Sequence, residues 1–443
     1  MNNPILSLKT FKTYSLGCRA NQAEMETISQ QLIDQGLRPS QSSEKPDLIL
    51  LNTCAVTQKA EKETRQIMRQ LKKIYPSAKL IVLGCAVTAR EKYKNPLPIA
   101  DLFIANEDKH RTLSLLEQKF GTFKKTKRVS QWESQYFASG RKFILIQTGC
   151  HNFCSFCLTA FLRGEPTSVS PQAIIEEINS WLALKIKEII LTGTNLALWG
   201  EDLEPTQTIT NLLSAILNQT KVERLSLSSI YPEMLTSDFL NLVIKNPRIS
   251  RYFHLSLQSG SATVLQRMKR KTNLNKLTNS LFYIKEKIPN FTLRADFITG
   301  FPNETEKEFQ ETLDFIKKTR ISFAHVFPFS LRENTLAFKM VKSQKWKDLP
   351  LAIKKERARK LTETVAAIRR EEAKKLIGRE YPTLIIRKIK EKDAYEGLTN
   401  NDWPILVQSS KLKIKNLKGE IKPVKITDYK NNQLLGEITS LPR

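Results

Sequence analysis

Short apolar segments alternate with amphipathic ones along the first hundred residues, and this alternation restricts the fold more than any other feature. Residues 47–54 (DLILLNTC) and 79–85 (KLIVLGC) are almost continuously apolar, and residues 58–74 between them have helical spacing. Near-continuous apolar runs are typical of parallel strands that are buried on both faces. With further strands expected in KTYSLGC (12–18) and LFIAN (102–106), the pattern predicts an open parallel α/β sheet.

A second run of alternating strands and helices begins at residue 143. Its six strand candidates are FILIQ (143–147), EIILT (188–192), ERLSLS (223–228), FHLSL (253–257), TLRADFI (292–298) and SFAHVF (322–327). Thr305 and Glu308 have capping-box spacing, which predicts a helix start after the fifth strand. Six strand–helix units are two short of an eight-stranded barrel, so the prediction is a partial (β/α)6 barrel.

The remaining segments complete an α/β multidomain chain. Residues 350–377 predict a long charged helix that ends at Gly378, and the tail switches to short strands (PTLIIRK, LKIK, IKPVKIT, LLGEIT) typical of a small β-barrel or sandwich. The predicted division is an N-terminal α/β domain (8–118), a basic linker (119–142), a barrel with its trailing helix (143–377) and a β-domain (379–443).

The charge of the chain points to a polyanionic partner. There are 71 Lys and Arg against 44 Asp and Glu, a net charge of +27, which favours binding to phosphates. The alternative is a Lys-rich proteome in which every protein is basic.

We find no apolar run long enough to span a membrane and no signal-peptide core, so we expect a cytoplasmic protein without a membrane partner. Six Cys are too few for a disulfide scaffold and indicate metal or redox chemistry.

Three of the cysteines form a local motif. Cys150, Cys154 and Cys157 have Cys-x3-Cys-x2-Cys spacing directly after an apolar strand. Three thiolates on one loop can ligate three irons of a cuboidal cluster and leave the fourth iron open, whereas such clusters normally take four Cys. Zinc is the competing interpretation, but it requires a fourth ligand, and His151 is poorly placed to supply it.

The other three cysteines are distant in sequence but occupy equivalent positions. Cys18, Cys54 and Cys85 each end a predicted strand, and they are separated by roughly 30 residues, about one βαβ unit. The carboxyl ends of parallel strands lie on one edge of a sheet, where open α/β folds bind ligands. We therefore expect the three thiols to converge; the alternative is three unconnected buried Cys.

The spacing Cys150/Cys154/Cys157 resembles the signature of radical S-adenosylmethionine (SAM) enzymes, and with both trios the chain resembles the methylthiotransferases. The resemblance covers nearly the whole chain; its motifs are SLGCRANQAEME, LNTCAVTQKAEKETRQ, VLGCAV, LTGTNLALWGEDL, HLSLQSGSATVLQRMKRK, FITGFPNETEKEFQETLDF and HVFPFSLREN. GCRANQAE and TCAVT are most similar to the branch that modifies N6-threonylcarbamoyladenosine in tRNA, ahead of the isopentenyl-adenosine and ribosomal-protein branches.

The resemblance implies a mechanism and a set of cofactors. Two 4Fe–4S clusters, one on each cysteine trio, act with SAM: the barrel cluster cleaves SAM to a radical that abstracts hydrogen from C2 of the adenine. The second cluster carries the sulfur that is inserted, and a second SAM supplies the methyl group. The β-domain is similar to a TRAM domain, which binds RNA, and the partners are tRNA with an unidentified electron donor and sulfur source.

The resemblance also implies cofactor contacts. Phe156 precedes the third Cys of the motif and is expected near the adenine of SAM. Thr192 and Gly193 follow the second barrel strand, where the superfamily binds the amino group of SAM, and Gly300 ends the fifth strand at the same mouth. The alternative for Gly193 and Gly300 is an ordinary turn residue.

Two departures from the family pattern bear on substrate choice. The segment 162–171 retains only Arg163 where further Arg are usual, and QTGC stands where an acid usually precedes Gly-Cys.

His254 and His325 lie in predicted strands and receive no role, because a lone strand His is more often a core residue than a ligand. The alternative of a different class is a non-catalytic Fe–S or zinc protein that binds RNA.

Overall fold

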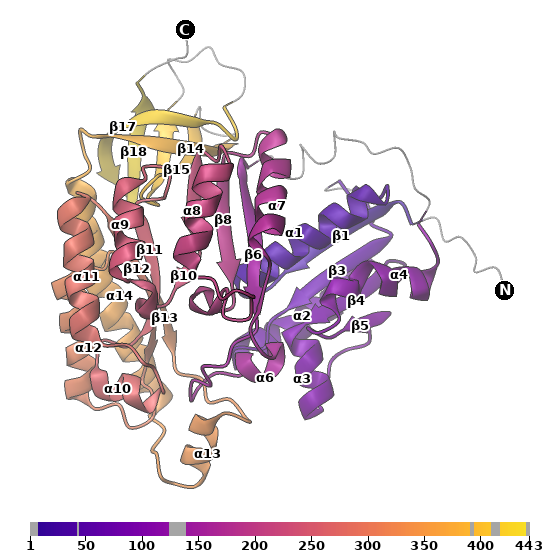
Figure 1. The fold of residues 1–443 in the computed structure, drawn as a ribbon. Helices are drawn as coiled ribbons and strands as arrows, with labels where there is room; N and C mark the ends of the chain where they lie inside the picture. Colours follow the sequence, from indigo (N-terminus) through magenta and orange to yellow (C-terminus); the bar gives the residue numbers. More distant parts are fainter. Residues whose placement is uncertain (1–7, 42–43, 124–138, 390–393, 409–416, 440–443) are drawn as a thin grey trace.

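The structure is a computed structural model that describes residues 8–41, 44–123, 139–389, 394–408 and 417–439. An N-terminal sheet, a central curved wall of strands and a C-terminal closed barrel follow one another along the chain (Figure 1). Among the described helices, none is both long enough and apolar enough to cross a membrane.

The N-terminal sheet is parallel throughout and has the order β2-β1-β3-β4-β5, which confirms the predicted open sheet. Ser15 pairs with Asn52 and Asn52 with Leu83, so the strands β1, β3 and β4 end at nearly the same level. The elements are β1 (Thr10–Ser15), α1 (Arg19–Asp34), β2 (Arg38–Pro39), β3 (Leu48–Thr53), α2 (Gln58–Ile74), β4 (Lys79–Gly84), α3 (Cys85–Tyr93), β5 (Leu102–Ile104), η1 (Lys109–Arg111) and α4 (Thr112–Phe120).

The predicted linker 119–142 lies mostly outside the described residues. At its two ends, Phe120 still belongs to α4, and the next strand, β6, already begins at Arg141.

The central wall contains the six predicted strands as successive parallel neighbours. Its sheets are β7-β6-β8-β9 and β10-β11-β12-β13, and β7 is the antiparallel member. Only Ser228 separates β9 from β10, and its amide donates to Leu191 O at 2.9 Å, so the predicted third strand is present but divided. The wall therefore curves as a partial barrel with helices on its outer side (Figure 1).

The elements of this part follow in chain order. They are β6 (Arg141–Thr148), α6 (Thr159–Arg163), β7 (Thr167–Ser168), α7 (Pro171–Ala183), β8 (Glu188–Gly193), η2 (Leu196–Leu198), α8 (Ile209–Gln219), β9 (Arg224–Leu227), β10 (Ser229–Ile230), η3 (Pro232–Met234), α9 (Ser237–Lys245), β11 (Tyr252–Gln258), α10 (Ala262–Arg267), α11 (Leu274–Lys287), β12 (Thr292–Thr299), α12 (Glu306–Thr319), β13 (Phe323–Pro328), α13 (Leu336–Lys342) and α14 (Leu351–Lys374).

Two helices show how local sequence sets these bounds. The predicted capping box is confirmed at α12: Thr305 Oγ1 accepts from the Glu308 amide, and the Glu308 carboxylate accepts from the Thr305 amide. The trailing helix α14 ends at Lys374, and Gly378 follows with φ +83. Leu361, Val365 and Ile368 of α14 enter the barrel core, so this helix packs along the edge strand β13.

The C-terminal strands form a closed barrel of order β14-β15-β16-β18-β17. Its members are β14 (Glu380–Ile389), β15 (Ala394–Thr399), β16 (Pro404–Gln408), β17 (Ile421–Lys430) and β18 (Gln433–Ile438). The sequence pattern missed β15 and β16, and the predicted strand LKIK (412–415) lies outside the described residues. This barrel sits on the amino-terminal ends of the central strands, where Trp403 Nε1 donates to Thr292 Oγ1 at 2.9 Å.

Candidate active site and cofactor sites

The first cysteine trio lies on the loop that follows β6. Gly149 has φ +76, and a Cβ there would lie 1.9 Å from the backbone oxygen of Glu165, so only glycine fits. Ser155 anchors the loop from the other side, because its amide and hydroxyl donate to Met268 O (3.1 Å) and Arg267 O (2.8 Å). The loop is therefore held at the carboxyl end of the barrel strands.

Each sulfur of this trio has its own hydrogen-bond donor. The Thr159 amide lies 3.3 Å from Cys157 Sγ, Asn195 Nδ2 lies 3.8 Å from Cys150 Sγ and Arg270 Nη1 lies 4.0 Å from Cys154 Sγ. Burial raises the pKa of Cys157 to about 11 and also raises that of Cys150, so without a metal these groups are neutral thiols. Three sulfurs with separate donors fit an Fe–S cluster, which binds thiolates and is tuned by such bonds.

The zinc alternative has no fourth ligand at this loop from His151. Its imidazole turns toward carboxylates, with Nε2 at 3.4 Å from Glu201 and Nδ1 at 3.9 Å from Glu165. Structural zinc sites are almost always four-coordinate. The donor set of this loop therefore favours iron.

Of the predicted cofactor residues, Phe156 lies on this loop, and Thr192 and Gly193 lie at the end of the neighbouring strand β8. Phe156 packs edge-on against Phe301, with ring centroids 6.5 Å apart. Thr192 is only 1% exposed, and its hydroxyl, like that of Thr194, has no hydrogen-bond partner among the described residues. Gly193 continues the same strand end. Two unpaired buried hydroxyls at the end of β8 fit a polar ligand.

Gly300 has a different environment from the other predicted cofactor residues. Its amide donates to Glu304 Oε2 at 2.7 Å, and a Cβ at its φ of +69 would lie 2.4 Å from Lys354 Cγ. This position lets α14 approach the end of β12 closely, and a contact with SAM stays a prediction.

The second trio lies at the carboxyl edge of the N-terminal sheet. Cys54 directly follows β3, but Cys18 caps α1 three residues beyond the end of β1, and Cys85 is the first residue of α3. The expectation that each Cys is the last residue of a strand is therefore wrong in detail, because the chain turns into a helix at these points. The three remain at one edge: a Cβ on Gly17 would lie 2.7 Å from Cys54 Sγ.

Buried charges surround the second trio. Arg163 Nη1 lies 2.8 Å from Glu24 Oε1, and Lys109 Nζ lies 2.5 Å from Glu24 Oε2, with all three side chains less than 10% exposed. Burial alone would raise the pKa of Glu24, but Arg163 and Lys109 lower it to about 2. Two cations against one carboxylate leave a net positive charge, which suits a ligand made of thiolates.

Two of these three thiols, those of Cys54 and Cys85, are buried, whereas Cys18 is exposed. Burial, together with the neighbouring Cys85 and Cys18, raises the pKa of Cys54 to about 12. Metal binding displaces such protons, because the ligand is the thiolate. The residues present therefore fit a second Fe–S cluster.

Both trios face the same mouth of the barrel. Asn106 Nδ2 donates to Cys85 Sγ (3.4 Å) and to Leu162 O (2.9 Å), and Leu162 belongs to the helix after the first trio. On the opposite side, Arg332 donates to Ala55 O at 3.0 Å, next to Cys54, and forms an ion pair with Glu61. Segments from both ends of the barrel wall thus hold the N-terminal trio over its carboxyl end.

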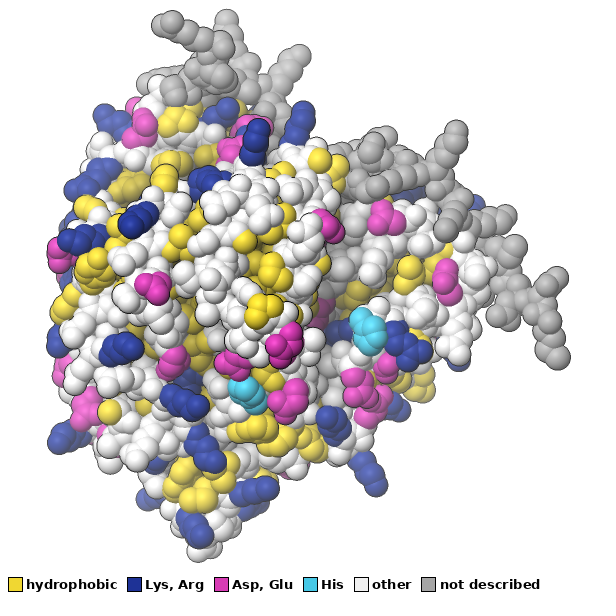
Figure 2. Space-filling view, in the orientation of Figure 1, with side chains coloured by type: hydrophobic (Ala, Val, Ile, Leu, Met, Phe, Trp, Pro, Cys, Tyr) yellow, Lys and Arg dark blue, Asp and Glu magenta, His cyan; other side chains and the backbone are white. Residues whose placement is uncertain are grey.

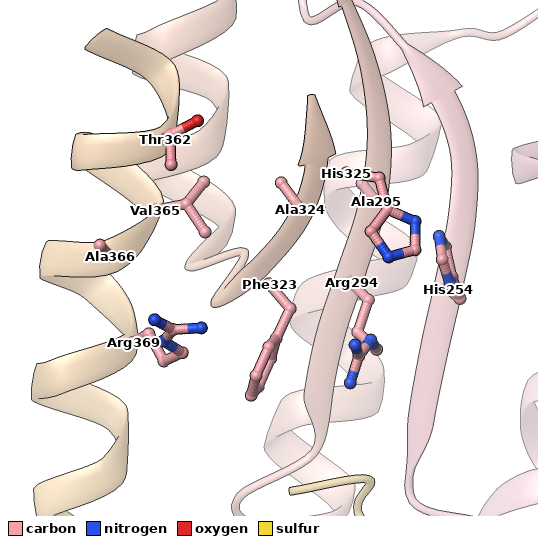
Figure 3. Close-up of a pocket in the computed structure, with 10 residues that line it drawn as sticks. All are labelled: His254, Arg294, Ala295, Phe323, Ala324, His325, Thr362, Val365, Ala366 and Arg369. Atoms are coloured by element: carbon pink, nitrogen blue, oxygen red, sulfur yellow. The ribbon is translucent and has the colours of Figure 1, made fainter. Parts of the chain in front are cut away.

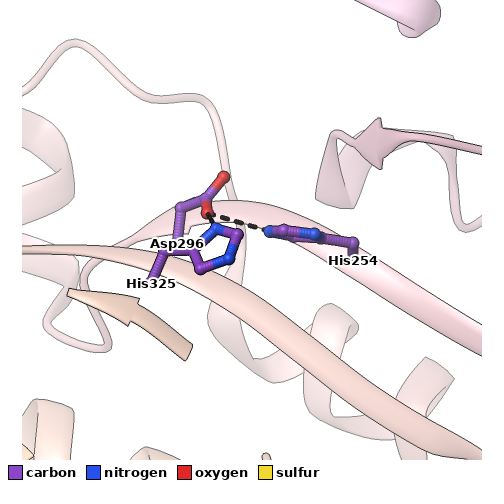
Figure 4. A group of neighbouring side chains, drawn as sticks. All are labelled: His254, Asp296 and His325. Carbon is purple, nitrogen blue, oxygen red and sulfur yellow. Dashed lines mark hydrogen bonds and ion pairs between the residues drawn. The ribbon is translucent and has the colours of Figure 1, made fainter. Parts of the chain in front are cut away.

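A further group of polar side chains lies inside the barrel, and no function was predicted for it from the sequence. His254 Nε2 lies 2.9 Å and His325 Nδ1 lies 3.1 Å from the same oxygen of Asp296 (Figure 4). Burial alone would raise the pKa of Asp296, but the two imidazoles lower it to about 2. These groups could hold a metal ion, since their ligand atoms lie within 4.8 Å of one another, but the two hydrogen bonds account for the arrangement without one.

The sequences of these strands contain a pattern from which the proximity of the three side chains could have been predicted. Alternate residues of a strand face the same side, so Arg294 and Asp296 share a face in the segment TLRADFI, and His254 and His325 stand at the middle of the neighbouring strands. Polar side chains on the inner face of a barrel meet one another across adjacent strands.

Comparisons with known proteins agree with this geometry. The model of the uncharacterized protein family UPF0004 matches residues 10–105, and that of the radical SAM superfamily matches residues 144–316. The threonylcarbamoyladenosine tRNA methylthiotransferase MtaB of Aquifex aeolicus (strain VF5) is 32% identical over 336 residues, which cover 74% of this chain and 82% of that protein.

A second relative carries a different substrate in its name. The tRNA-2-methylthio-N(6)-dimethylallyladenosine synthase of Clostridium botulinum (strain Langeland) is 31% identical over 76% of this chain and 79% of that protein. Among solved structures, the radical SAM methyltransferase TsrM of Kitasatospora setae aligns with a TM-score of 0.53 at 12% identity, over 76% of this chain and 78% of that one. This last likeness concerns the fold alone.

Proposed function

The chain belongs to the radical SAM methylthiotransferases, and from this premise we propose that it inserts sulfur and a methyl group at C2 of N6-threonylcarbamoyladenosine, next to the anticodon of tRNA. As a member of that family it is an enzyme that uses SAM and a 4Fe–4S cluster. The proposal adds the target base and a second 4Fe–4S cluster on Cys18, Cys54 and Cys85. The non-catalytic alternative is not compatible with family membership.

One observation carries the proposal: two cysteine trios share one barrel mouth. The helix that follows the first trio supplies Arg163 and Leu162 to the surroundings of the second. A base held in the barrel below this mouth lies within reach of both groups. When bound, the clusters and SAM supply the radical that removes hydrogen and the sulfur that replaces it.

The residues of the chain orient these groups and exclude water. Arg270 donates to the sulfur of Cys154, Asn195 to that of Cys150 and the Thr159 amide to that of Cys157, and these hydrogen bonds would stabilise the thiolates. The hydroxyls of Thr192 and Thr194 would bind the amino acid part of SAM, and Phe156 would contact its adenine. The apolar residues Ala55, Ala86, Leu158 and Leu162 pack around the buried Cys85 of the second trio and keep water from it.

The charge of the protein supports a nucleic-acid substrate. Lys and Arg side chains are distributed over the visible face instead of gathering in one patch (Figure 2). We propose that the C-terminal barrel, which we compare with a TRAM domain, contacts the phosphates of the tRNA through exposed residues such as Lys388 and Lys425. Phosphate contacts position an RNA without reading its sequence, and a loop base can leave the stack to enter a pocket.

The choice of target base is a proposal about this chain, because relatives named for either modified adenosine match at nearly the same identity. The residues GCRANQAE and TCAVT around the first two Cys favour threonylcarbamoyladenosine. Mass spectrometry of tRNA nucleosides from a deletion strain tests it: the 2-methylthio derivative of threonylcarbamoyladenosine should disappear and the unthiolated nucleoside should accumulate. Loss of the isopentenyl derivative instead would assign the chain to the other tRNA branch, and a change confined to ribosomal protein would assign it to the third.

A further inference from the structure

A cavity of about 240 Å³ lies inside the barrel between its edge strand and the trailing helix, and no residue of either cysteine trio lines it. Its walls come from β11, β12 and β13 on one side and from Thr362, Val365, Ala366 and Arg369 of α14 on the other (Figure 3). We propose that this cavity holds the substituent on N6 of the target adenosine and that Arg369 binds its carboxylate. This inference rests on the proposed function and names the residue that would select the substrate.

The charges around the cavity are balanced except at Arg369. Arg294 forms an ion pair with Asp402 at 2.6 Å, and His254 and His325 both bond to Asp296. The acids nearest along the helix, Glu371 and Glu372, are occupied by Arg320.

Arg369 has no such partner among the described residues. Its Nε is buried without a hydrogen bond, and its guanidinium stacks over Phe323 at 5.5 Å from the ring centroid. The side chain projects from α14 toward the strands (Figure 3). Arg369 is partly buried, and a partly desolvated cation without a counter-charge is unfavourable, so the cavity favours an anionic occupant.

The two candidate N6 substituents differ in charge and polarity, and these are the properties by which this cavity would discriminate between them. A threonylcarbamoyl group ends in a carboxylate and carries a hydroxyl, whereas an isopentenyl group is entirely apolar. The planar guanidinium matches a carboxylate through two parallel hydrogen bonds. An apolar group would leave Arg369 unpaired, and a site built for a polar group rejects an analogue that lacks it.

The depth of the cavity agrees with this role. His254, Ala295 and Ala324 lie in the first half of their strands, whereas the cysteine loop follows the carboxyl end of β6. On adenine, the C2–H bond and the bond to N6 diverge. A base whose C2 points toward the cysteine loops therefore directs its N6 substituent away from them, into the barrel.

The test compares Arg369→Gln with Arg370→Gln in the reconstituted enzyme. Arg370 is the exposed neighbour on the same helix and serves as the matched control. The substrates are anticodon stem-loop RNAs that carry threonylcarbamoyladenosine, its methyl ester or isopentenyladenosine. We expect Arg369→Gln to lower kcat/KM for the acid by about 10- to 100-fold, as for loss of a hydrogen bond to a charged group. Arg370→Gln should remain within twofold of the wild type.

Comparison of the acid with its methyl ester tests the role of the carboxylate in the wild-type enzyme, so the result does not depend on whether a variant folds. The wild type should use the ester about 10- to 100-fold less well than the acid, and Arg369→Gln should treat the two alike. Arg369→Lys, which keeps the charge but not the planar fork, should retain part of the preference.

Failure of the inference can be told apart from failure of the proposed function. Equal use of acid and ester by the wild type, or an unchanged kcat/KM in Arg369→Gln, would overturn the role of Arg369 while the acid remains the substrate. A wild type that modifies only the isopentenyl RNA would overturn both.

Discussion

Arg163 Nη1 and Glu24 Oε1 lie 2.8 Å apart, and this buried ion pair joins the helix after the barrel cysteine loop to the first helix of the N-terminal sheet. Arg163 also donates to Asn21 Oδ1 at 2.6 Å, and the Asn21 amide in turn donates to Thr53 O, next to Cys54. The one arginine that the atypical segment 162–171 retains is thus committed to connecting the two cysteine trios. It is not available to read the modified base.

Loss of that carboxylate should destabilise the protein. Glu24→Gln leaves Arg163 and Lys109 buried without a counter-charge, which typically costs about 3–5 kcal/mol. Urea unfolding measures the change in the free energy of unfolding. Glu63→Gln, at an exposed position on α2, is the control and should shift it by less than about 0.5 kcal/mol. Equal stability of the two variants would contradict the importance of the pair.

The same carboxylate should make stability depend on pH. The pKa of Glu24 is about 2 in the folded protein against 4.5 ordinarily, so its contribution is complete above pH 4.5 and is lost as the pH falls toward 2. The difference in unfolding free energy between the wild type and Glu24→Gln should therefore shrink across this range. A difference that stays constant with pH would show that Glu24 is not ionised in the way proposed.

Removal of a barrel cysteine should abolish SAM cleavage. Cys154→Ala is expected to form no 5′-deoxyadenosine after anaerobic reconstitution, because an Fe–S cluster is held by its thiolate ligands. Bound iron should fall from about eight to about four per chain, which two independent four-iron clusters imply. Formation of 5′-deoxyadenosine at the wild-type rate would remove the cluster from this loop.

Removal of a cysteine from the other trio should separate the two halves of the reaction. Cys54→Ala should lose about four irons but still cleave SAM, because the barrel loop and its donors are untouched. Sulfur insertion should stop, as measured by mass spectrometry of the RNA product. A normal methylthio product from this variant would exclude the second trio from the mechanism.

Two glycines that flank the barrel loop form a matched pair. Gly149 and Gly164 have similar φ values of +76 and +73, but a Cβ on Gly149 would collide with the backbone of Glu165, whereas one on Gly164 meets nothing within 4 Å. Gly149→Ala should therefore displace the cysteine loop and reduce bound iron by about half, while Gly164→Ala adds only backbone strain of about 1–2 kcal/mol. Iron analysis and thermal unfolding separate the two effects, and equal iron content would contradict the prediction.

The features that could be predicted from sequence have local causes. The N-terminal parallel sheet and the six barrel strands follow from apolar runs, and the start of α12 follows from Thr305 and Glu308. β15 and β16 were missed because Gly397 and Pro404 weaken their strand signal, and closure of the barrel stabilises them through pairing with neighbours.

The sequence by itself determined which chemistry the chain can hold, because the Cys-x3-Cys-x2-Cys spacing and the repeat of Cys at strand ends are written in the order of residues. Only the tertiary structure decided where charges meet. In the sequence, Glu24 lies in the first helix and Arg163 lies beyond the N-terminal domain. Arg369 is likewise far from His254, and no local pattern relates the members of either pair. Such pairs depend on how helices and strands pack, and packing is a property of the whole chain, since each contact is stabilised by burial of residues distant in sequence.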